Sequence, residues 1–269
     1  MNRLIKTDFK RFFKDKLFLV ACIIAGVFAI ITPLLYKVIF SFIDIDLSEM
    51  GLIMDVKTMF FSAFSLTNNL GLIAPIFIMI IISKDFSFGT IRNKIIKGHS
   101  RAKIFISLFI VSASILSLIM FAYAAINGLL TLALFSDLVN EITAKEVGYF
   151  MLSLLFELLV MIFVASIMSF LATYMKNAGV AIVMYAALLL GLSAVTGIIQ
   201  IAVNFVENET LANALKTLSL LNVFYNTTII GMGTSYKLID ALMISLSSVI
   251  FTAMLLTLGI VGFNKKDLK

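Results

Sequence analysis

Six predominantly apolar stretches, each twenty or more residues long and separated by short polar segments, constrain this 269-residue chain more than any other feature. A bilayer core about 30 Å thick is crossed by roughly 20 helical residues, each of which rises about 1.5 Å. The stretches cover residues 17–36, 59–83, 104–135, 148–174, 178–206 and 241–262. The chain is 61% apolar and only 13% charged, and the charged residues lie in short segments between the apolar stretches. No segment therefore remains for a separate soluble domain. We therefore expect one all-α, polytopic transmembrane domain over 1–269, with about six spans.

The basic residues collect in alternate polar segments. Of 21 lysines and arginines, 16 lie in the N-terminal segment, in 84–103, at Lys176 or after the last span. The other polar segments hold only five lysines, but they hold ten of the 15 acidic residues. Because basic loops stay in the cytoplasm, both ends are expected there. This distribution favours a multi-pass membrane protein over a nucleic-acid-binding protein, and the membrane that we expect is a bacterial plasma membrane.

The first 16 residues form a basic segment with helical apolar spacing. Ile5, Phe9, Phe12 and Phe13 follow the i, i+4, i+7, i+8 rule, and lysines occupy the other faces. Over 1–16 we expect a cytoplasmic amphipathic helix that lies along the lipid headgroups. The alternative is a basic flank that only sets the orientation of the first span.

The basic segment 84–103 separates the second and third spans. Gly89 permits a bend, after which Ile91, Ile95 and Ile96 can share one helical face. Gly98 is a candidate helix C-cap, and Ser100 could cap the start of the third span. A short helix with an isoleucine face could insert into a groove on a cytoplasmic partner. The alternative is a solvated basic loop with no role beyond topology.

Two short motifs resemble those of type-2 ATP-binding-cassette (ABC) exporter permeases. That family has Glu-x-x-x-Gly-Thr, a short coupling helix and Ser-Arg in its first cytoplasmic loop, and Phe-x-Lys/Arg-Arg/Lys-Asp at its end. The corresponding residues here are Asp85-x-x-x-Gly89-Thr90, Ile95-Ile96, Ser100-Arg101 and, at the end, Gly262-Phe263-Asn264-Lys265-Lys266-Asp267. Asp85 replaces the usual Glu, and Gly98 stands near a common proline. With the six-span layout, the resemblance covers the whole chain.

This resemblance implies a permease subunit that forms the translocation path of an exporter. A separate cytoplasmic ABC ATPase would bind ATP and magnesium, so the chain itself would need no cofactor and would not be an enzyme. A second permease subunit, identical or related, would complete the path. The implied ATPase-coupling residues are Asp85, Gly89, Thr90, Ile91, Arg92, Ile95, Ile96, Ser100 and Arg101.

Glu157 is the only ionisable residue inside a predicted span. A charge at mid-depth is costly unless it is paired or hydrated. Asn68 and Asn69 lie at similar depth in the second span. These residues could line a translocation path, or Glu157 could make a buried interhelical hydrogen bond. A stand-alone channel or secondary carrier that uses Glu157 is therefore the alternative function.

Small residues recur every four positions in the first and fifth spans, at Ala21, Ala25 and Ala29 and at Ala187 and Gly191. Small residues let helices approach closely in lipid. Packing within the subunit explains this spacing simply. The resemblance implies that these two spans also meet across a permease dimer.

The segment 207–240 is the least decided part of the chain. Its leucines have helical spacing over 211–233, but polar residues such as Lys216 and Asn226 interrupt them, so we expect a short external or re-entrant helix. The chain has no G-x-x-x-x-G-K-[ST] loop, and its one histidine and one cysteine lie far apart. Neither ATP binding nor a metal site is therefore predicted, and the substrate is not indicated.

Overall fold

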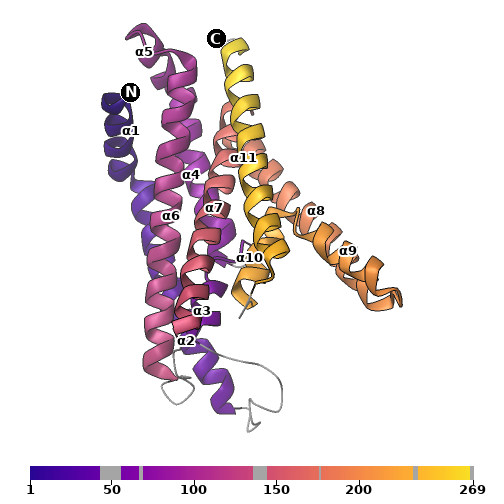
Figure 1. Cartoon of the computed structure of the whole chain (residues 1–269). Coiled ribbons are helices and arrows are strands. Elements are labelled where there is room, and N and C mark those ends of the chain that lie inside the picture. Colours follow the sequence, from indigo (N-terminus) through magenta and orange to yellow (C-terminus); the bar gives the residue numbers. More distant parts are fainter. Residues whose placement is uncertain (43–55, 67–68, 136–143, 176, 233–235, 267–269) are drawn as a thin grey trace.

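The computed structural model describes residues 1–42, 56–66, 69–135, 144–175, 177–232 and 236–266, which form eleven helices and no strand. The helices are α1 (Asn2–Lys14), α2 (Lys16–Phe42), α3 (Val56–Ser62), α4 (Asn69–Ser87), α5 (Thr90–Ile96), α6 (Arg101–Leu134), α7 (Ala144–Tyr174), α8 (Ala178–Phe205), α9 (Glu209–Ser219), α10 (Val223–Met232) and α11 (Leu238–Lys265). The predicted all-α class is confirmed (Figure 1).

Five helices, α2, α6, α7, α8 and α11, are long and apolar enough to cross a membrane. Ile73–Ser87, which is most of α4, and α5 together pass the same test as a pair bent by 58°, which gives up to six spans. The chain is therefore a multi-pass, polytopic membrane protein, as its apolar stretches predicted.

The second span departs from the continuous stretch predicted over 59–83. It is interrupted between α3 and α4, and the backbone of Ser65 and Leu66 passes so close to Gly71 that a Cβ there would overlap it. The ring of Phe61 in α3 packs on Phe150 of α7, with centroids 5.1 Å apart. We attribute the break to this packing, because burying α3 between α6, α7 and α10 requires the chain to turn before α4 begins.

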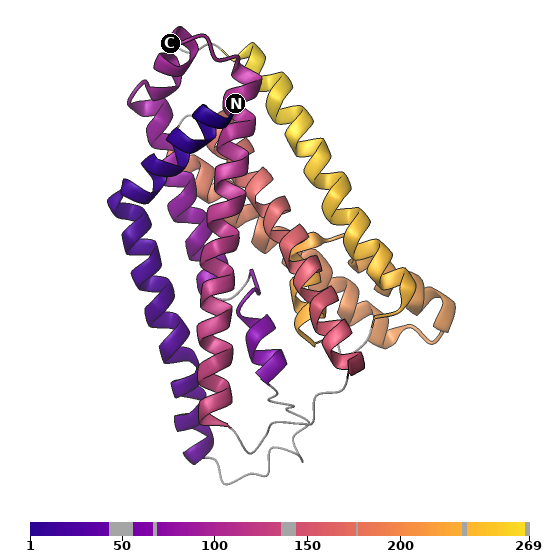
Figure 2. The same ribbon diagram turned by 60° about the vertical axis from the view of Figure 1, so that its left-hand side comes forward.

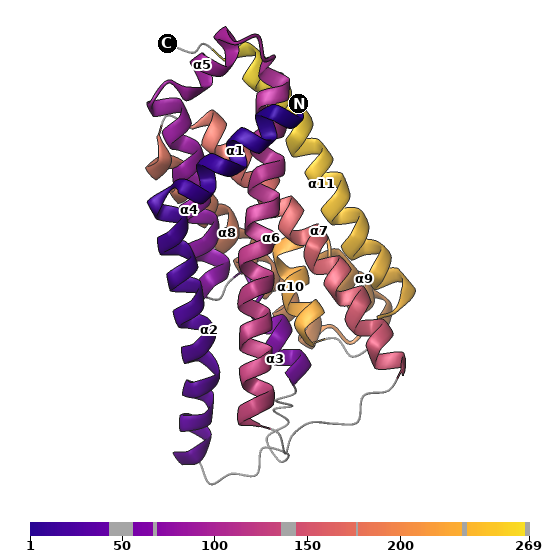
Figure 3. The same cartoon turned by 90° about the vertical axis from the view of Figure 1, so that its left-hand side faces the viewer.

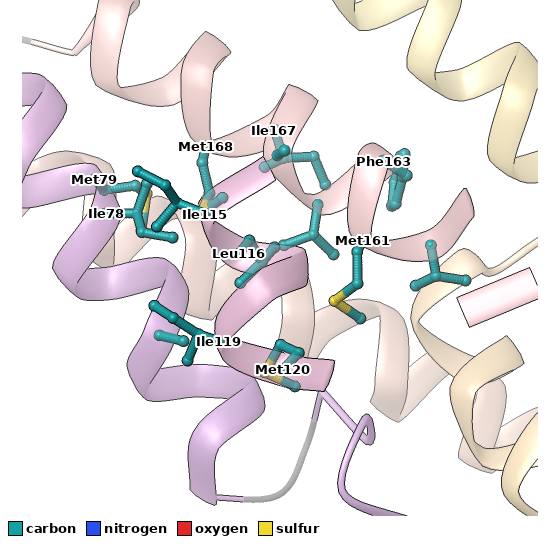
Figure 4. Packing of buried hydrophobic residues seen from close by; sticks show 14 of the residues in the cluster. Ile78, Met79, Ile115, Leu116, Ile119, Met120, Met161, Phe163, Ile167 and Met168 are labelled. Atoms are coloured by element: carbon teal, nitrogen blue, oxygen red, sulfur yellow. The ribbon is translucent and has the colours of Figure 1, made fainter. Parts of the chain in front are cut away.

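Two helices form the centre of the bundle. In their most apolar windows, 61% of α6 and 56% of α7 is buried, against 22% of α2 and 17% of α8. Figure 4 shows Leu116 and Met120 of α6 beside Met161 of α7, with Ile78 of α4 close by. The peripheral helices expose large apolar side chains to the surroundings, as membrane-spanning helices do.

α1, α5 and the C-terminal end of α11 lie at one end of the bundle, as Figures 1, 2 and 3 show. This is the end that carries the basic segments, which the positive-inside rule predicts to face the cytoplasm. The basic segments that the charge pattern assigns to one side of the membrane therefore also lie together at one end of the folded bundle.

The segment 207–240 contains two helices rather than one. The chain turns around Asn222, whose side-chain oxygen accepts a hydrogen bond from the Phe224 N–H at 3.1 Å and so caps α10. α9 runs back along α8, and α10 lies against α3, α7, α8 and α11, with Asn226 and Thr227 buried. In Figure 1, α8 and α9 project away from the rest of the bundle.

Candidate functional site

α5 is a short helix set at an angle to α4 by its flanking residues. Gly89 has φ +68°, a left-handed conformation that favours glycine, and it forms the turn into Thr90–Ile96. Gly98, with φ +85°, follows the last turn, and the Ser100 hydroxyl accepts a hydrogen bond from the Lys103 N–H at 3.4 Å. The predicted helix, its glycine end and the Ser100 cap are therefore confirmed.

The predicted isoleucine face is divided between the core and the surface. Ile91 is 1% exposed and Ile95 is half-buried, whereas Ile96 is 81% exposed. Residues four apart share a helical face, and the bundle covers the face of Ile91 and Ile95. Ile96 lies about 100° further around the helix. Phe88, in the turn between α4 and α5, is 77% exposed, so Phe88 and Ile96 are two large apolar side chains that this segment leaves exposed.

The exposed surface of α5 also carries hydrogen-bonding and charged side chains. Thr90 begins the helix and is half-buried, while Arg92, Asn93 and Lys97 are exposed. Exposed apolar and polar side chains are thus mixed on this segment, and protein–protein interfaces combine both kinds of contact.

A buried ion network attaches α5 to three other helices. The Asp8 carboxylate of α1 accepts hydrogen bonds from the Lys94 ammonium at 2.6 Å and from the Ser107 hydroxyl of α6 at 2.7 Å. Lys94 also lies 3.6 Å from Asp85 at the end of α4, and Asp85 pairs with Arg11 of α1. Asp8 and Asp85 are 1% and 3% exposed. α1, α4, α5 and α6 are thus joined through buried charges.

Burial makes these charges depend on one another. It lowers the pKa of the Lys94 ammonium, and the Asp8 carboxylate opposes that shift. Burial also lowers the pKa of the Arg11 guanidinium, against the attraction of Asp8 and Asp15. A buried cation is costly without a partner, so separating α1 from α5 requires water to enter the network.

A second ion pair fixes the joint between α1 and α2. The Lys84 ammonium donates to both carboxylate oxygens of Asp15, at 2.9 and 3.0 Å, and the Leu17 N–H donates to the same carboxylate at 2.9 Å. Burial raises the pKa of Asp15, but these hydrogen bonds outweigh it and hold the pKa below its ordinary value. The start of α2 is therefore tied to the end of α4.

The C-terminal motif is tied to the same end. The Arg101 guanidinium donates to the carbonyl oxygens of Phe263, Asn264 and Lys266, at 3.3, 3.0 and 2.5 Å. The Lys266 ammonium donates to the Thr173 carbonyl oxygen at the end of α7. The two segments that carry the family resemblance thus contact each other directly, which their separation in the sequence did not indicate.

One face of α1 packs on protein rather than on lipid. Leu4, Asp8 and Phe12 lie four residues apart and are buried, while Phe13 is 50% exposed. The sequence predicted Phe12 in the headgroup region. It turns inward because it shares its helical face with Asp8, which binds α5 and α6.

Glu157 lies fully buried on α7. Among the described residues, neither of its carboxylate oxygens has a hydrogen-bond partner. One turn away, the Ser153 hydroxyl is hydrogen-bonded to the Tyr236 hydroxyl at 2.6 Å. Asn226 of α10 donates to the Ser247 hydroxyl of α11 at 3.3 Å. Buried polar groups therefore lie along the region where α7, α10 and α11 pack together.

The predicted association of Glu157 with the second-span asparagines falls mostly outside this description. Asn68 lies outside the described residues. Asn69 is the first residue of α4, and its side chain is also outside them.

The two small-residue patterns have different surroundings. Ala21, Ala25 and Ala29 are buried within the chain, in the helix that packs along α6 and α4. Ala187 and Gly191 are exposed on α8, and a Cβ at Gly191 would meet no other atom within 4 Å. Of the two candidate dimer-interface patterns, only the one on α8 lies on the free surface.

Sequence reasoning did not identify Asp8, Arg11 and Lys94 as a network, or Phe88 as an exposed group. Asp8 was the available signal, since a lone acid on a basic helix suggests a specific partner. Comparison with protein-family models, curated proteins and solved structures finds no match to this chain. The fold therefore defines the class alone, a polytopic all-α membrane protein.

Proposed function

We propose that this chain is the membrane-spanning permease subunit of an ABC exporter in a plasma membrane. The observation that carries the proposal is that α5 is held by buried ion pairs while Ile96 at its end and Phe88 in the turn before it stay exposed. A surface loop that served only for topology would not need this attachment. The loop and C-terminal motifs that resemble the permease family support the same function.

The coupling mechanism follows from these attachments. A cytoplasmic ABC ATPase docks on Phe88 and Ile96, and its closure on ATP moves α5. The pair between Lys94 and Asp8 transmits this movement to α1, and the turn at Gly89 transmits it to α4. Because packed helices have discrete arrangements, such a push selects between two states of the bundle. Different substrate affinities in the two states give transport its direction.

The second permease subunit, an identical or related chain, packs on the exposed small residues of α8 in this proposal. Ala187 and Gly191 let a partner helix approach closely. Burial of Ala21, Ala25 and Ala29 within the chain limits the part that α2 can play in this contact.

The test is co-purification of an ABC ATPase with the full chain, followed by measurement of ATP hydrolysis in reconstituted vesicles. Phe88→Ser and Ile96→Ser, combined, are expected to abolish both. Phe13→Ser is the matched control, because Phe13 is also an exposed aromatic at this end but lies on α1. Retention of the ATPase by the double variant would refute the proposed docking surface.

A stand-alone channel or secondary carrier is the second candidate. The specific observation in its favour is the buried Glu157 carboxyl, whose oxygens have no hydrogen-bond partner among the described residues. Such a carrier transports without an ATPase and depends on an ion gradient. Glu157→Gln abolishes transport by a carrier and leaves ATP-driven export intact, so one variant separates the two functions.

A further inference from the structure

A pocket of about 440 Å³ lies far from α5, between α8, α9, α10 and the start of α11. Lys237 directly precedes α11, which extends over 28 residues to the end of the bundle where α1 and α5 lie. A helix of that length is about 42 Å long. The pocket is therefore about one membrane thickness away from the proposed docking surface, on the side that the charge distribution places outside.

The lining of the pocket combines positive charge with apolar walls. Lys216 of α9 and Lys237 both line it, and Asp240 is the one acid among its lining residues. Within the part of the chain that the structure describes, neither lysine has an ion pair. Leu220 and Ile229 provide apolar surface. Two lysines opposite one carboxylate favour an anionic group, and the apolar wall favours a molecule with a hydrocarbon part.

The surroundings of the pocket fit an occupant from the bilayer. Leu238 and Leu242 follow Lys237 on the first turns of α11 and are 78% and 50% exposed. Leu218, beside the lining residues of α9, is 50% exposed. Lys237 stands at the end of a membrane-spanning helix, which is the depth of lipid headgroups. The pocket therefore opens where a charged headgroup meets apolar chains.

From this arrangement we infer that the pocket binds an anionic amphiphile of the outer leaflet. Its phosphate or carboxylate lies between the Lys216 and Lys237 ammonium groups, where the Tyr225 hydroxyl is a further donor. Its hydrocarbon chain lies along Leu238 and Leu242. This site goes beyond the proposed function and does not depend on it, because it needs neither an ATPase nor movement of α5.

The test uses tryptophan fluorescence, since the natural chain contains no tryptophan. Ile239→Trp places the sole tryptophan at the pocket, and a lysophosphatidylglycerol with a brominated tail quenches it on binding. Leu129→Trp is the control for unspecific lipid contact, because Leu129 is 66% exposed on α6. The full chain, in a neutral detergent, is titrated with this lipid and with the brominated phosphatidylcholine analogue.

We expect the brominated lysophosphatidylglycerol to reach half-maximal quenching of the I239W reporter at a concentration at least tenfold lower than its phosphatidylcholine analogue. The L129W control should show no such preference. Lys216→Gln and Lys237→Gln in the I239W chain each weaken binding about fivefold, as exposed charge pairs do. Lys216→Arg retains the charge and the affinity. Lys145→Gln, the loss of an exposed lysine on α7, leaves binding unchanged.

Three results would overturn the inference. Equal affinity for the two lipids would mean that only the tail binds. Undiminished binding by both glutamine variants, with correct folding verified by gel filtration and circular dichroism, would exclude the lysines as the headgroup site. Complete displacement of the lysophosphatidylglycerol by millimolar inorganic phosphate would identify a free-anion site in place of an amphiphile site.

Discussion

Breaking the pair between Asp8 and Lys94 is expected to release α1 from the rest of the bundle. Asp8 accepts one hydrogen bond from Lys94 at 2.6 Å and one from Ser107 at 2.7 Å, and its side chain is 1% exposed. Removing one member of a buried pair leaves an uncompensated charge, which costs about 3–5 kcal/mol. The two members are not equivalent, so the two single substitutions have different costs.

Lys94→Met is the more severe change. It leaves the Asp8 carboxylate with Ser107 as its remaining hydrogen-bond donor and with the attraction of Arg11, so a cost of about 3 kcal/mol, the lower end of this range, is expected. Asp8→Asn leaves Lys94 with Asp85 at 3.6 Å, and an asparagine oxygen still accepts from Ser107. Its cost is therefore about 1–3 kcal/mol, the range for an incompletely satisfied buried group.

Hydrogen exchange measured by mass spectrometry, on the full chain in lipid nanodiscs, reads out this loss. Each 1.4 kcal/mol of opening free energy changes the exchange rate about tenfold. Lys94→Met should therefore speed exchange in residues 2–14 at least about a hundredfold, and Asp8→Asn about tenfold. The double variant should cost less than the sum of the two, because it leaves no isolated charge.

Lys10→Gln is the matched control, since Lys10 is an exposed lysine of the same helix. It should change exchange in residues 2–14 by less than about twofold, as surface substitutions usually do. Unchanged exchange of these residues in Lys94→Met would refute the argument. Strict additivity of the two substitutions would also refute it, because residues in direct contact are coupled.

Three further predictions concern other parts of the chain. Gly71→Ala should lower the thermal unfolding midpoint in detergent by at least about 5 °C, because its Cβ would overlap the backbone at Leu66, whereas Gly26→Ala has open space and should leave the midpoint unchanged or raise it. Glu157→Gln should leave the midpoint unchanged or raise it, because the buried carboxyl loses no hydrogen bond observed among the described residues. The pKa of Asp15 is lowered, so its contribution to stability is present above the ordinary carboxyl pKa of about 3.9 and is lost as pH falls through the lower folded-state value. Exchange near Leu17, corrected for its intrinsic pH dependence, should show this transition, and Asp15→Asn should remove it.

Helix positions were predictable from the sequence wherever lipid alone determines them. The span expected over 104–135 is α6 (Arg101–Leu134), and the span expected over 178–206 is α8 (Ala178–Phe205). Local chemistry was also readable, since Gly89 and Ser100 have the turn and cap roles that their residue types favour. The spans depend on the lipid bilayer, which surrounds each of them in the same way, and the turn and the cap depend on contacts within a few residues.

The second span was not predictable to the same degree. Apolar residues continue on both sides of Thr67-Asn68-Asn69, and this short polar stretch was interpreted as part of the span rather than as a break before α4. The break depends on what surrounds it, namely the ring of Phe150 against Phe61 and the close approach of the backbone at Leu66 to Gly71. Such contacts join residues that are distant in the sequence or fix a turn that composition does not specify.

By itself the sequence determined that this chain is a bundle of membrane-spanning helices, and its lysines and arginines predict which end faces the cytoplasm. Hydropathy and charge act on each segment independently of the others, so they can be read locally. Only the tertiary structure decided that Asp8 binds Lys94, that Ile91 is covered while Ile96 is free, and that Arg101 holds the C-terminal end. Those outcomes depend on which side chains the packed helices bring together, and no single segment contains that information.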